Sequence, residues 1–243
     1  MNLILLQKAE VDADGRAVLS DDRARHIRKI LKAEPGKQLR VGLLDGPFGT
    51  GTVESMDGTL VVVKCEFDPE LPPIPRIDLL LAMPRPKVMK RLWAQLAALG
   101  TGRIVLLRAE KVERYYFDSH VIEPGFYNKM LVEGLQQARC THLPEVLVRP
   151  LFKPFVEDEL EALFPDHLKL LADPAGTKRL SEIQDLGAGK RVLLAIGPEG
   201  GWTPYELEML QARGFRLFGM GNRILRTDTA TVGLISMIAE QVG

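Results

Sequence analysis

A glycine-rich turn near the end of the chain, residues 197–201, has the composition of a ligand site. It follows an apolar run at 192–196 and precedes Thr203, Pro204 and Glu206, which are typical of a helix N-terminus. Glycines let the backbone approach a ligand closely. The turn has neither the Lys-Ser or Lys-Thr ending of a phosphate-binding loop nor the Gly-x-Gly-x-x-Gly pattern of a dinucleotide site. It indicates a site for another kind of ligand, although a tight strand-to-helix turn without a ligand has the same composition.

A second turn follows about twenty residues later. A short strand is predicted at 217–218, glycines stand at 219 and 221, and Thr227 or Asp228 suits the N-cap of a last helix. Arg223 and Arg226 flank an apolar pair between the turn and the helix. Because open α/β sheets bind ligands at the carboxyl ends of their strands, we expect the two turns to meet and form one pocket.

The elements that position these turns follow a repeating strand-and-helix pattern. A Leu-rich strand is predicted at 77–83, then a helix that begins at Pro86 and ends at Gly100. Further strands are predicted at 103–107, 146–148, 168–172 and 191–196, and helices at 125–138 and 155–164. This alternation predicts an α/β domain with a mostly parallel sheet.

The first part of the chain has a different pattern. Short alternating segments at 17–19, 38–44, 51–55 and 59–66 predict a small antiparallel barrel, with one helix inserted at 21–31. Four prolines stiffen the segment that follows. We therefore divide the chain into a barrel at 1–67, a linker at 68–75 and an α/β domain at 76–243.

Charge and composition restrict the partners. Thirty-two basic and thirty-two acidic residues balance, so nucleic-acid binding would depend on local clusters, such as residues 23–40 and 83–109. Cys65 and Cys140 lack neighbours at metal-ligand spacing, so we predict no metal. The N-terminus lacks the pattern of a signal peptide and no apolar run could span a bilayer. We expect a cytoplasmic protein that does not bind a membrane.

The two turns, in this order and at this spacing, closely resemble the paired cofactor motifs of the RsmE family. These bacterial SPOUT-class methyltransferases methylate N3 of a uridine in 16S ribosomal RNA. The similarity extends to residues 26–32 with Gly36, and to 133–144 with Gln137 and Arg139, and so covers nearly the whole chain. At 112–115 the sequence Val-Glu-Arg-Tyr stands where the family has Thr-Glu-Arg-Ser.

The resemblance implies a PUA-like N-terminal barrel, a SPOUT α/β domain with a deep trefoil knot, S-adenosylmethionine (SAM) as cofactor, 16S rRNA within the small ribosomal subunit as partner, and a homodimer. The residues it implies for cofactor binding are Gly197, Pro198, Glu199, Gly200, Gly201, Met220, Gly221, Ile224, Leu225 and Thr229. Those we assign to RNA binding are Arg23, Arg25, His26, Arg28, Lys29, Lys32, Arg85, Lys87 and Arg139. For the dimer contact we suggest the apolar face of the last helix, with Val232, Ile235 and Ile238, and its alternative is packing within the chain.

Methylation of uridine N3 requires the loss of a weakly acidic proton. We assign Arg226 to stabilising the uridine anion and Glu199 to accepting the proton. We also expect a side chain at Gly200 to fill the cofactor space. Two alternatives stay open: a SPOUT enzyme that acts on another RNA or position, and a non-catalytic RNA-binding factor of ribosome assembly.

Overall fold

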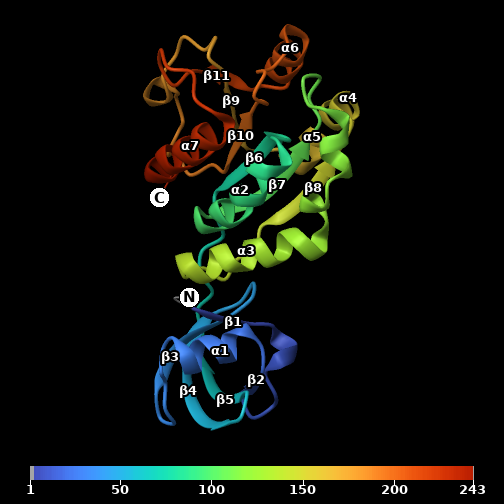
Figure 1. Cartoon of the computed structure of the whole chain (residues 1–243). Coiled ribbons are helices and arrows are strands. Elements are labelled where there is room, and N and C mark those ends of the chain that lie inside the picture. Colours follow the sequence, from blue (N-terminus) through green and yellow to red (C-terminus); the bar gives the residue numbers. More distant parts are fainter. Residues whose placement is uncertain (1–2, 243) are drawn as a thin grey trace. The chain divides into compact units, whose positions relative to one another are not determined.

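The computed structural model describes residues 3–242, which form two compact units (Figure 1). The first unit contains the residues up to Ile74 and the segment Val132–Leu143, and the second contains Pro75–Leu131 and the residues from Pro144 onward. Our predicted domain limits at residues 1 and 243 lie outside the described residues. Within the described part of the chain, no helix is long and apolar enough to cross a membrane.

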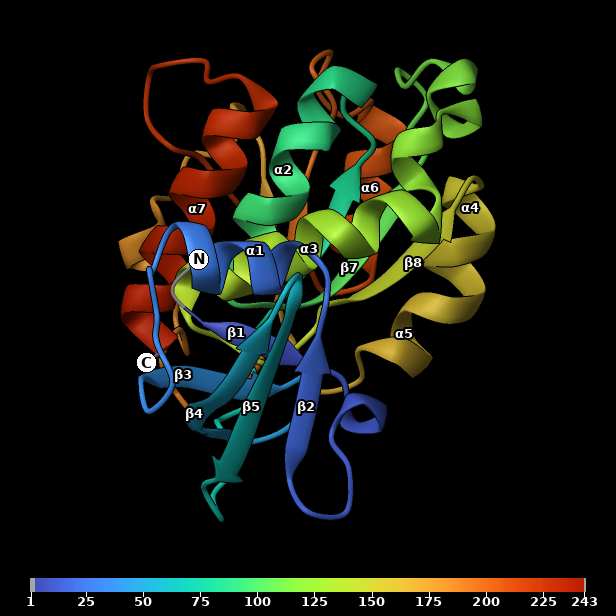
Figure 2. The ribbon, with the colours of Figure 1, turned by 60° about the horizontal axis from the view of Figure 1, so that its bottom comes forward.

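The first unit is built on a curled sheet with the strand order β1-β3-β4-β5-β2 (Figure 2). Its strands are β1 (Ile4–Leu6), β2 (Arg16–Leu19), β3 (Gln38–Leu43), β4 (Phe48–Asp57) and β5 (Leu60–Phe67). All neighbours pair antiparallel except β1, which we did not predict and which pairs parallel with β3. The predicted inserted helix is α1 (Asp22–Lys29), and its Ile27 is completely buried in the apolar core of this unit.

Residues 68–76, which we assigned mostly to a linker, form neither helix nor strand. The segment Val132–Leu143 returns to the first unit, although it follows much of the α/β region in sequence. The Thr141 hydroxyl donates a hydrogen bond to the Gly46 carbonyl (2.7 Å), and the Asp45 amide donates to the Thr141 carbonyl (2.8 Å). These hydrogen bonds explain why the segment Val132–Leu143 belongs to the first unit.

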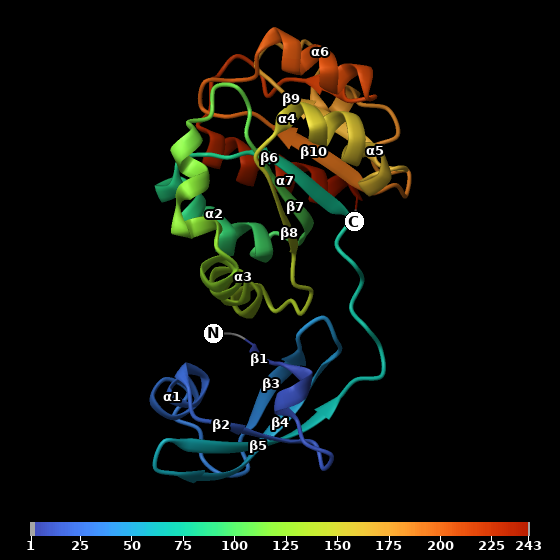
Figure 3. The ribbon, with the colours of Figure 1, turned by 90° about the vertical axis from the view of Figure 1, so that its right-hand side faces the viewer.

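The second unit has a parallel sheet with the strand order β11-β9-β10-β6-β7-β8 (Figure 3). Its strands are β6 (Ile77–Ala82), β7 (Thr101–Leu107), β8 (Glu145–Arg149), β9 (Leu168–Ala172), β10 (Val192–Ile196) and β11 (Arg216–Phe218). Every residue of β6 and of β10 is buried, as the continuous apolar runs predict for strands covered on both faces. The predicted α/β sheet is confirmed, and its carboxyl edge is where the loops that follow the strands gather.

Helices follow most of these strands in the sequence. They are α2 (Pro86–Ala98), α3 (Pro124–Ala138), α4 (Phe152–Pro154), α5 (Leu160–Leu163), α6 (Pro204–Ala212) and α7 (Thr227–Val242). A π-turn, η4 (Phe155–Glu159), joins α4 to α5, and short 3₁₀ turns are η1 (Lys8–Glu10), η2 (Arg114–Asp118), η3 (His120–Ile122) and η5 (Leu180–Glu182).

The apolar face of α7 packs inside the second unit. Ile235 and Ile238 are completely buried within the chain. They are therefore not free to form the dimer contact that we assigned to them, and the alternative of packing within the chain is correct for both residues. Val232 is half-buried.

Candidate active site

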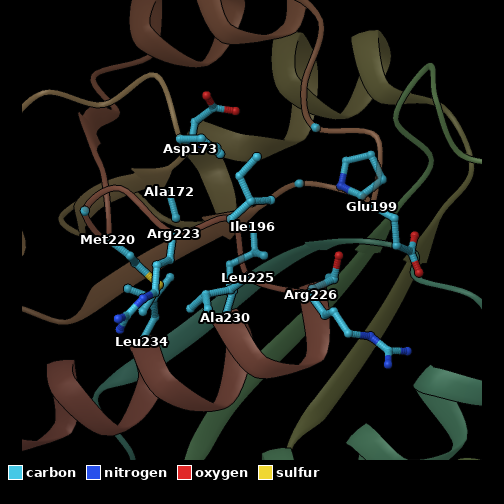
Figure 4. A pocket seen from close by; sticks show the side chains of 17 residues that line it. Ala172, Asp173, Ile196, Glu199, Met220, Arg223, Leu225, Arg226, Ala230 and Leu234 are labelled. Atoms are coloured by element: carbon cyan, nitrogen blue, oxygen red, sulfur yellow. The ribbon is translucent and has the colours of Figure 1, made fainter.

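A cavity of about 310 Å³ lies at the carboxyl ends of β9, β10 and β11, beside the start of α7 (Figure 4). This size suits a small-molecule site, and this edge of an α/β sheet is the usual place for one. Its wall consists of residues 172–174, 196–199 and 201, 220, 221 and 223–227, and of Ala230 and Leu234 from α7. The two glycine turns therefore meet, as their positions after the strands predict.

The first turn is held by the start of α6. Thr203 is the N-cap: its side chain accepts a hydrogen bond from the Glu206 amide, while the Glu206 carboxylate accepts one from the Thr203 amide (2.8 Å). Gly201 has φ +69°, a conformation that favours glycine, and its amide donates to the Pro198 carbonyl (2.9 Å). The predicted capping box is confirmed, and it fixes where the turn ends.

At Gly197, a side chain would be crowded by the neighbouring tryptophan. A Cβ atom there would lie 3.0 Å from Nε1 of the buried Trp202 ring. The backbone of Gly197 faces the cavity and its other side faces this indole. A glycine here therefore allows the turn to fit between the tryptophan and a ligand.

The second turn supplies the apolar part of the wall. Gly221 has φ +89°, and Met220 and Leu225 line the cavity with Ala230 of α7. Figure 4 shows Met220 and Arg223 on one side of the cavity and Glu199 and Arg226 on the other.

Our sequence reasoning missed Asp173, which lines the cavity directly after β9. One carboxylate oxygen accepts a hydrogen bond from the Ala175 amide (2.8 Å), and the Asp173 amide donates to the Phe218 carbonyl (3.1 Å). The loop after β9 passes very close to the end of β11, since a Cβ at Gly176 would lie 2.2 Å from a backbone atom of Phe218. The sequence Asp-Pro-Ala-Gly is typical of a turn, so the only signal for a ligand contact was its place after a strand. The trefoil knot stays a prediction.

Most residues predicted for cofactor binding line this cavity, but Gly200 and Thr229 do not. A Cβ at Gly200 would meet the Lys111 side chain at 3.0 Å, and the Lys111 ammonium donates to the Gly200 carbonyl (2.8 Å). A side chain at Gly200 would therefore press on Lys111 instead of filling the cavity. Thr229 is exposed on α7. The cavity thus gives no support to these two assignments, which stay predictions.

A second hollow continues from the cavity. It shares Glu199, Arg226 and Thr227 with the cavity and is completed by Arg85, Val88 and Asp228. One Glu199 carboxylate oxygen accepts a hydrogen bond from the Arg85 amide (3.2 Å). The Arg226 side chain is 78% exposed and lies 3.9 Å from Asp228, a distant ion pair. The two residues predicted to be catalytic thus lie where the two hollows join.

The predicted RNA-binding residues fall into two groups. Arg85 and Lys87 are exposed around the start of α2, and Arg85 lines the second hollow. The others lie in the first unit, where exposed side chains are Arg25, Lys29, Lys32 and Arg139, and half-buried ones are His26 and Arg28.

Arg23 has a structural role. Its guanidinium donates to the carboxylates of Glu10 and Asp21 and to the Leu5 carbonyl, and its side chain is 16% exposed. These partners occupy the guanidinium, so the structure does not support the assignment of Arg23 to RNA binding, which stays a prediction.

Residues 3–242 contain no group of three or more His, Cys, Asp or Glu side chains that could hold a metal ion. The Cys65 thiol is buried, and burial raises its pKa to about 11, so this thiol stays protonated at neutral pH.

The similarity to known proteins extends over the whole chain. Residues 70–239 match the family model of an RNA methyltransferase domain. The chain is 32% identical over 246 aligned residues to the Ribosomal RNA small subunit methyltransferase E of Treponema pallidum, covering 98% of this chain and 90% of that protein. This chain belongs to the ribosomal RNA small subunit methyltransferase E family. The resemblance of the two glycine turns is thereby confirmed.

Two further members are similar over their full length. The chain is 26% identical to Ribosomal RNA small subunit methyltransferase E 1 of Borreliella burgdorferi, covering 100% of this chain and 99% of that protein. The crystal structure of the family member from Neisseria gonorrhoeae, bound to S-adenosyl methionine, has a TM-score of 0.80 at 19% identity and covers 99% and 97% of the two chains. This likeness confirms the fold class.

Proposed function

We propose that this protein is a SAM-dependent methyltransferase that methylates N3 of a uridine in 16S rRNA of the small ribosomal subunit. The observation that carries this proposal is the cavity formed by the two glycine turns, with a second, arginine-lined hollow that shares part of its wall. Family membership supports the reaction class, and the Neisseria gonorrhoeae relative is bound to S-adenosyl methionine.

The residues of the cavity fit this cofactor. Ile196, Leu225 and Ala230 provide an apolar wall for the adenine ring, while Gly201 and Gly221 bring main chain to the surface without a side chain in the way. The Asp173 carboxylate can accept hydrogen bonds from ribose hydroxyls or from the methionine ammonium. When bound, SAM supplies a methyl group activated by a cationic sulfur.

The second hollow fits the uridine base. The Arg226 guanidinium, exposed and only distantly paired, stabilises the negative charge that develops on the base when N3 loses its proton. One Glu199 oxygen is bonded to the Arg85 amide, and its other oxygen, which makes no hydrogen bond within residues 3–242, accepts the N3 proton directly or through water. The chain thus contributes mainly orientation and charge.

The test is transfer of tritiated methyl groups from SAM to small subunits that lack the modification, followed by nucleoside mapping. The proposal expects label at N3 of a single uridine. Label in transfer RNA only, or at another base atom, would contradict it. Absence of SAM binding by calorimetry would instead favour a non-catalytic assembly factor.

The proposed role of Arg226 has its own test. Arg226→Ala is expected to lower the single-turnover rate about 100-fold while SAM affinity stays within about twofold, because the guanidinium acts on the transition state. Arg226→Lys, which keeps a positive charge, should recover part of the rate. An unchanged rate in Arg226→Ala would exclude the anion-stabilising role. We also propose a homodimer, as the family resemblance implies, and light scattering of the protein in solution tests it.

A further inference from the structure

Several arginines of the second unit are ion-paired, among them Arg149 at the carboxyl end of β8, which pairs with Glu159 (2.7 Å). Arg103 pairs with Glu145 (2.6 Å), and Arg191 pairs with Asp78 (2.7 Å), both near the amino ends of their strands. Arg108, directly after β7 at the carboxyl edge, forms no ion pair and no side-chain hydrogen bond within residues 3–242. The Arg114 side chain in η2 likewise forms no ion pair and no hydrogen bond within residues 3–242.

Arg108 is half-buried and lines two hollows at this edge. Arg114, which is exposed, lines one of them. A partly desolvated guanidinium without an anionic partner is costly, and it gains most from a bidentate anion such as phosphate. The carboxylates of Glu110 and Asp118 also line these hollows, but neither is paired with Arg108 or Arg114 in the described chain.

The loop after β7 is fastened to the first glycine turn. The Lys111 ammonium donates to the Gly200 carbonyl (2.8 Å), and the Glu110 amide donates to the buried Glu206 carboxylate (2.8 Å). Strand β7 also pairs with β6, which leads to Arg85 in the proposed uridine hollow. Arg108 and Arg114 therefore lie on the loop next to the proposed reaction site.

The same loop carries an exposed aromatic ring. The Tyr115 side chain is 63% exposed, and its ring lies edge-on to Tyr116 with the centroids 4.9 Å apart. Tyr116 is buried below it and close enough to Glu199 that burial, a hydrogen bond with Tyr115 and the negative charge of Glu199 all raise the Tyr116 pKa. An exposed ring supported in this way can stack against an unpaired base.

We propose that Arg108 and Arg114 bind the phosphates of single-stranded RNA next to the target uridine, and that Tyr115 stacks on a base of that strand. The proposal rests on the function proposed above. Protein enzymes reach the atoms of a base by taking it out of its stack, which leaves neighbouring nucleotides unpaired and in need of support. Two guanidinium groups and one aromatic ring suit a single strand, because phosphate contacts fix its position and stacking on a ring tolerates any base.

The first test combines Arg108→Gln with Arg114→Gln. The KM for small subunits should rise about tenfold or more, while kcat and SAM affinity stay within about twofold. Each phosphate contact on a single strand adds about 0.7 to the steepness of log affinity against log salt, because binding there releases counterions. Losing two contacts should therefore reduce the magnitude of this slope by about 1.4. The matched control combines Arg213→Gln, half-buried, with Lys190→Gln, exposed, both located before strands at the opposite edge. An equal effect in the control, or an unchanged KM and slope in the test variant, would overturn the proposal.

The second test compares Tyr115→Ala with Tyr115→Phe. The alanine variant should raise the KM for RNA about tenfold, and phenylalanine should restore it, because stacking needs the ring and not the hydroxyl. Equal behaviour of the two variants would overturn the stacking role. If wild-type protein binds RNA through these residues yet transfers no methyl group to rRNA, the proposed function fails while the binding surface stands.

Discussion

Asp78→Asn tests whether stability and ligand binding depend on opposite edges of the parallel sheet. Asp78 lies near the start of β6 with 1% of its surface exposed. Its carboxylate accepts hydrogen bonds from Arg191 (2.7 and 2.8 Å), from the Arg103 amide (2.7 Å) and shares one with His167 (2.7 Å). Replacing it with asparagine keeps the shape but leaves the Arg191 charge without its partner.

The expected cost is large. Removing one partner of a buried ion pair costs about 3–5 kcal/mol, and we expect the lower end because the Arg191 side chain, 37% exposed, can turn toward water. For a chain of this size that corresponds to a fall in Tm of about 6–12 °C. The matched control is Asp185→Asn, which removes the exposed Arg216 pair (3.0 Å) and should cost about 1 kcal/mol or less.

The effect depends on pH. Burial alone would raise the pKa of Asp78, but hydrogen bonds from His167 and Arg191 and the Arg191 charge outweigh it and hold the pKa below its ordinary value. A depressed folded-state pKa stabilises the protein above the unfolded pKa, near 4, and this contribution disappears as the pH falls through the folded pKa. The Tm difference between wild type and Asp78→Asn should therefore be constant from about pH 5 to pH 8 and shrink below about pH 4.

Calorimetric melting without SAM measures these differences, and titration at low temperature measures SAM affinity of the folded variant. We expect the affinity to stay within about twofold of wild type, since the cavity lies at the other end of the strands. A Tm loss no larger than that of Asp185→Asn, or a large loss of SAM affinity, would refute the reasoning.

Three further variants test the cavity. Asp173→Asn should weaken SAM binding about 10-fold to 100-fold in calorimetry with little change in Tm, because a charged acceptor is lost; unchanged affinity would exclude its contact with the cofactor. Gly197→Ala should lower the Tm by an amount equivalent to about 1–3 kcal/mol and shift the emission of Trp202, whose ring lies 3.0 Å from the new Cβ; wild-type emission and Tm would contradict the packing. Lys111→Met, which keeps the stem beside Gly200, should weaken SAM binding only a few-fold, and a loss as large as that of Asp173→Asn would show that Lys111 does more than hold the turn.

The sequence predicted the parts of the site that depend on local chemistry. Thr203, Pro204 and Glu206 predicted a helix start, and the structure has the complete capping box there. The glycines at 201 and 221 predicted turns, and both have positive φ. Since parallel strands end at one edge, placing the two turns together needed only their positions after strands.

Features that depend on distant partners were not predictable in this way. Spacing within the first turn does not reveal that Gly200 faces Lys111, because Lys111 comes from another strand's loop. Arg23 pairs with Glu10, which is thirteen residues earlier and is brought to it only by the fold of the first unit. Likewise, the periodicity of α7 shows an apolar face but not whether that face packs within the chain or against a second copy.

We infer that the two glycine turns form the SAM site and present its methyl group to the arginine-lined hollow. A crystal structure of the protein with SAM tests this most directly. We expect the adenosine and methionine parts to contact residues 197–199, 201, 220, 221 and 223–225, with the methyl group facing Glu199 and Arg226. SAM bound in another hollow, or a methyl group directed away from Arg226, would contradict it.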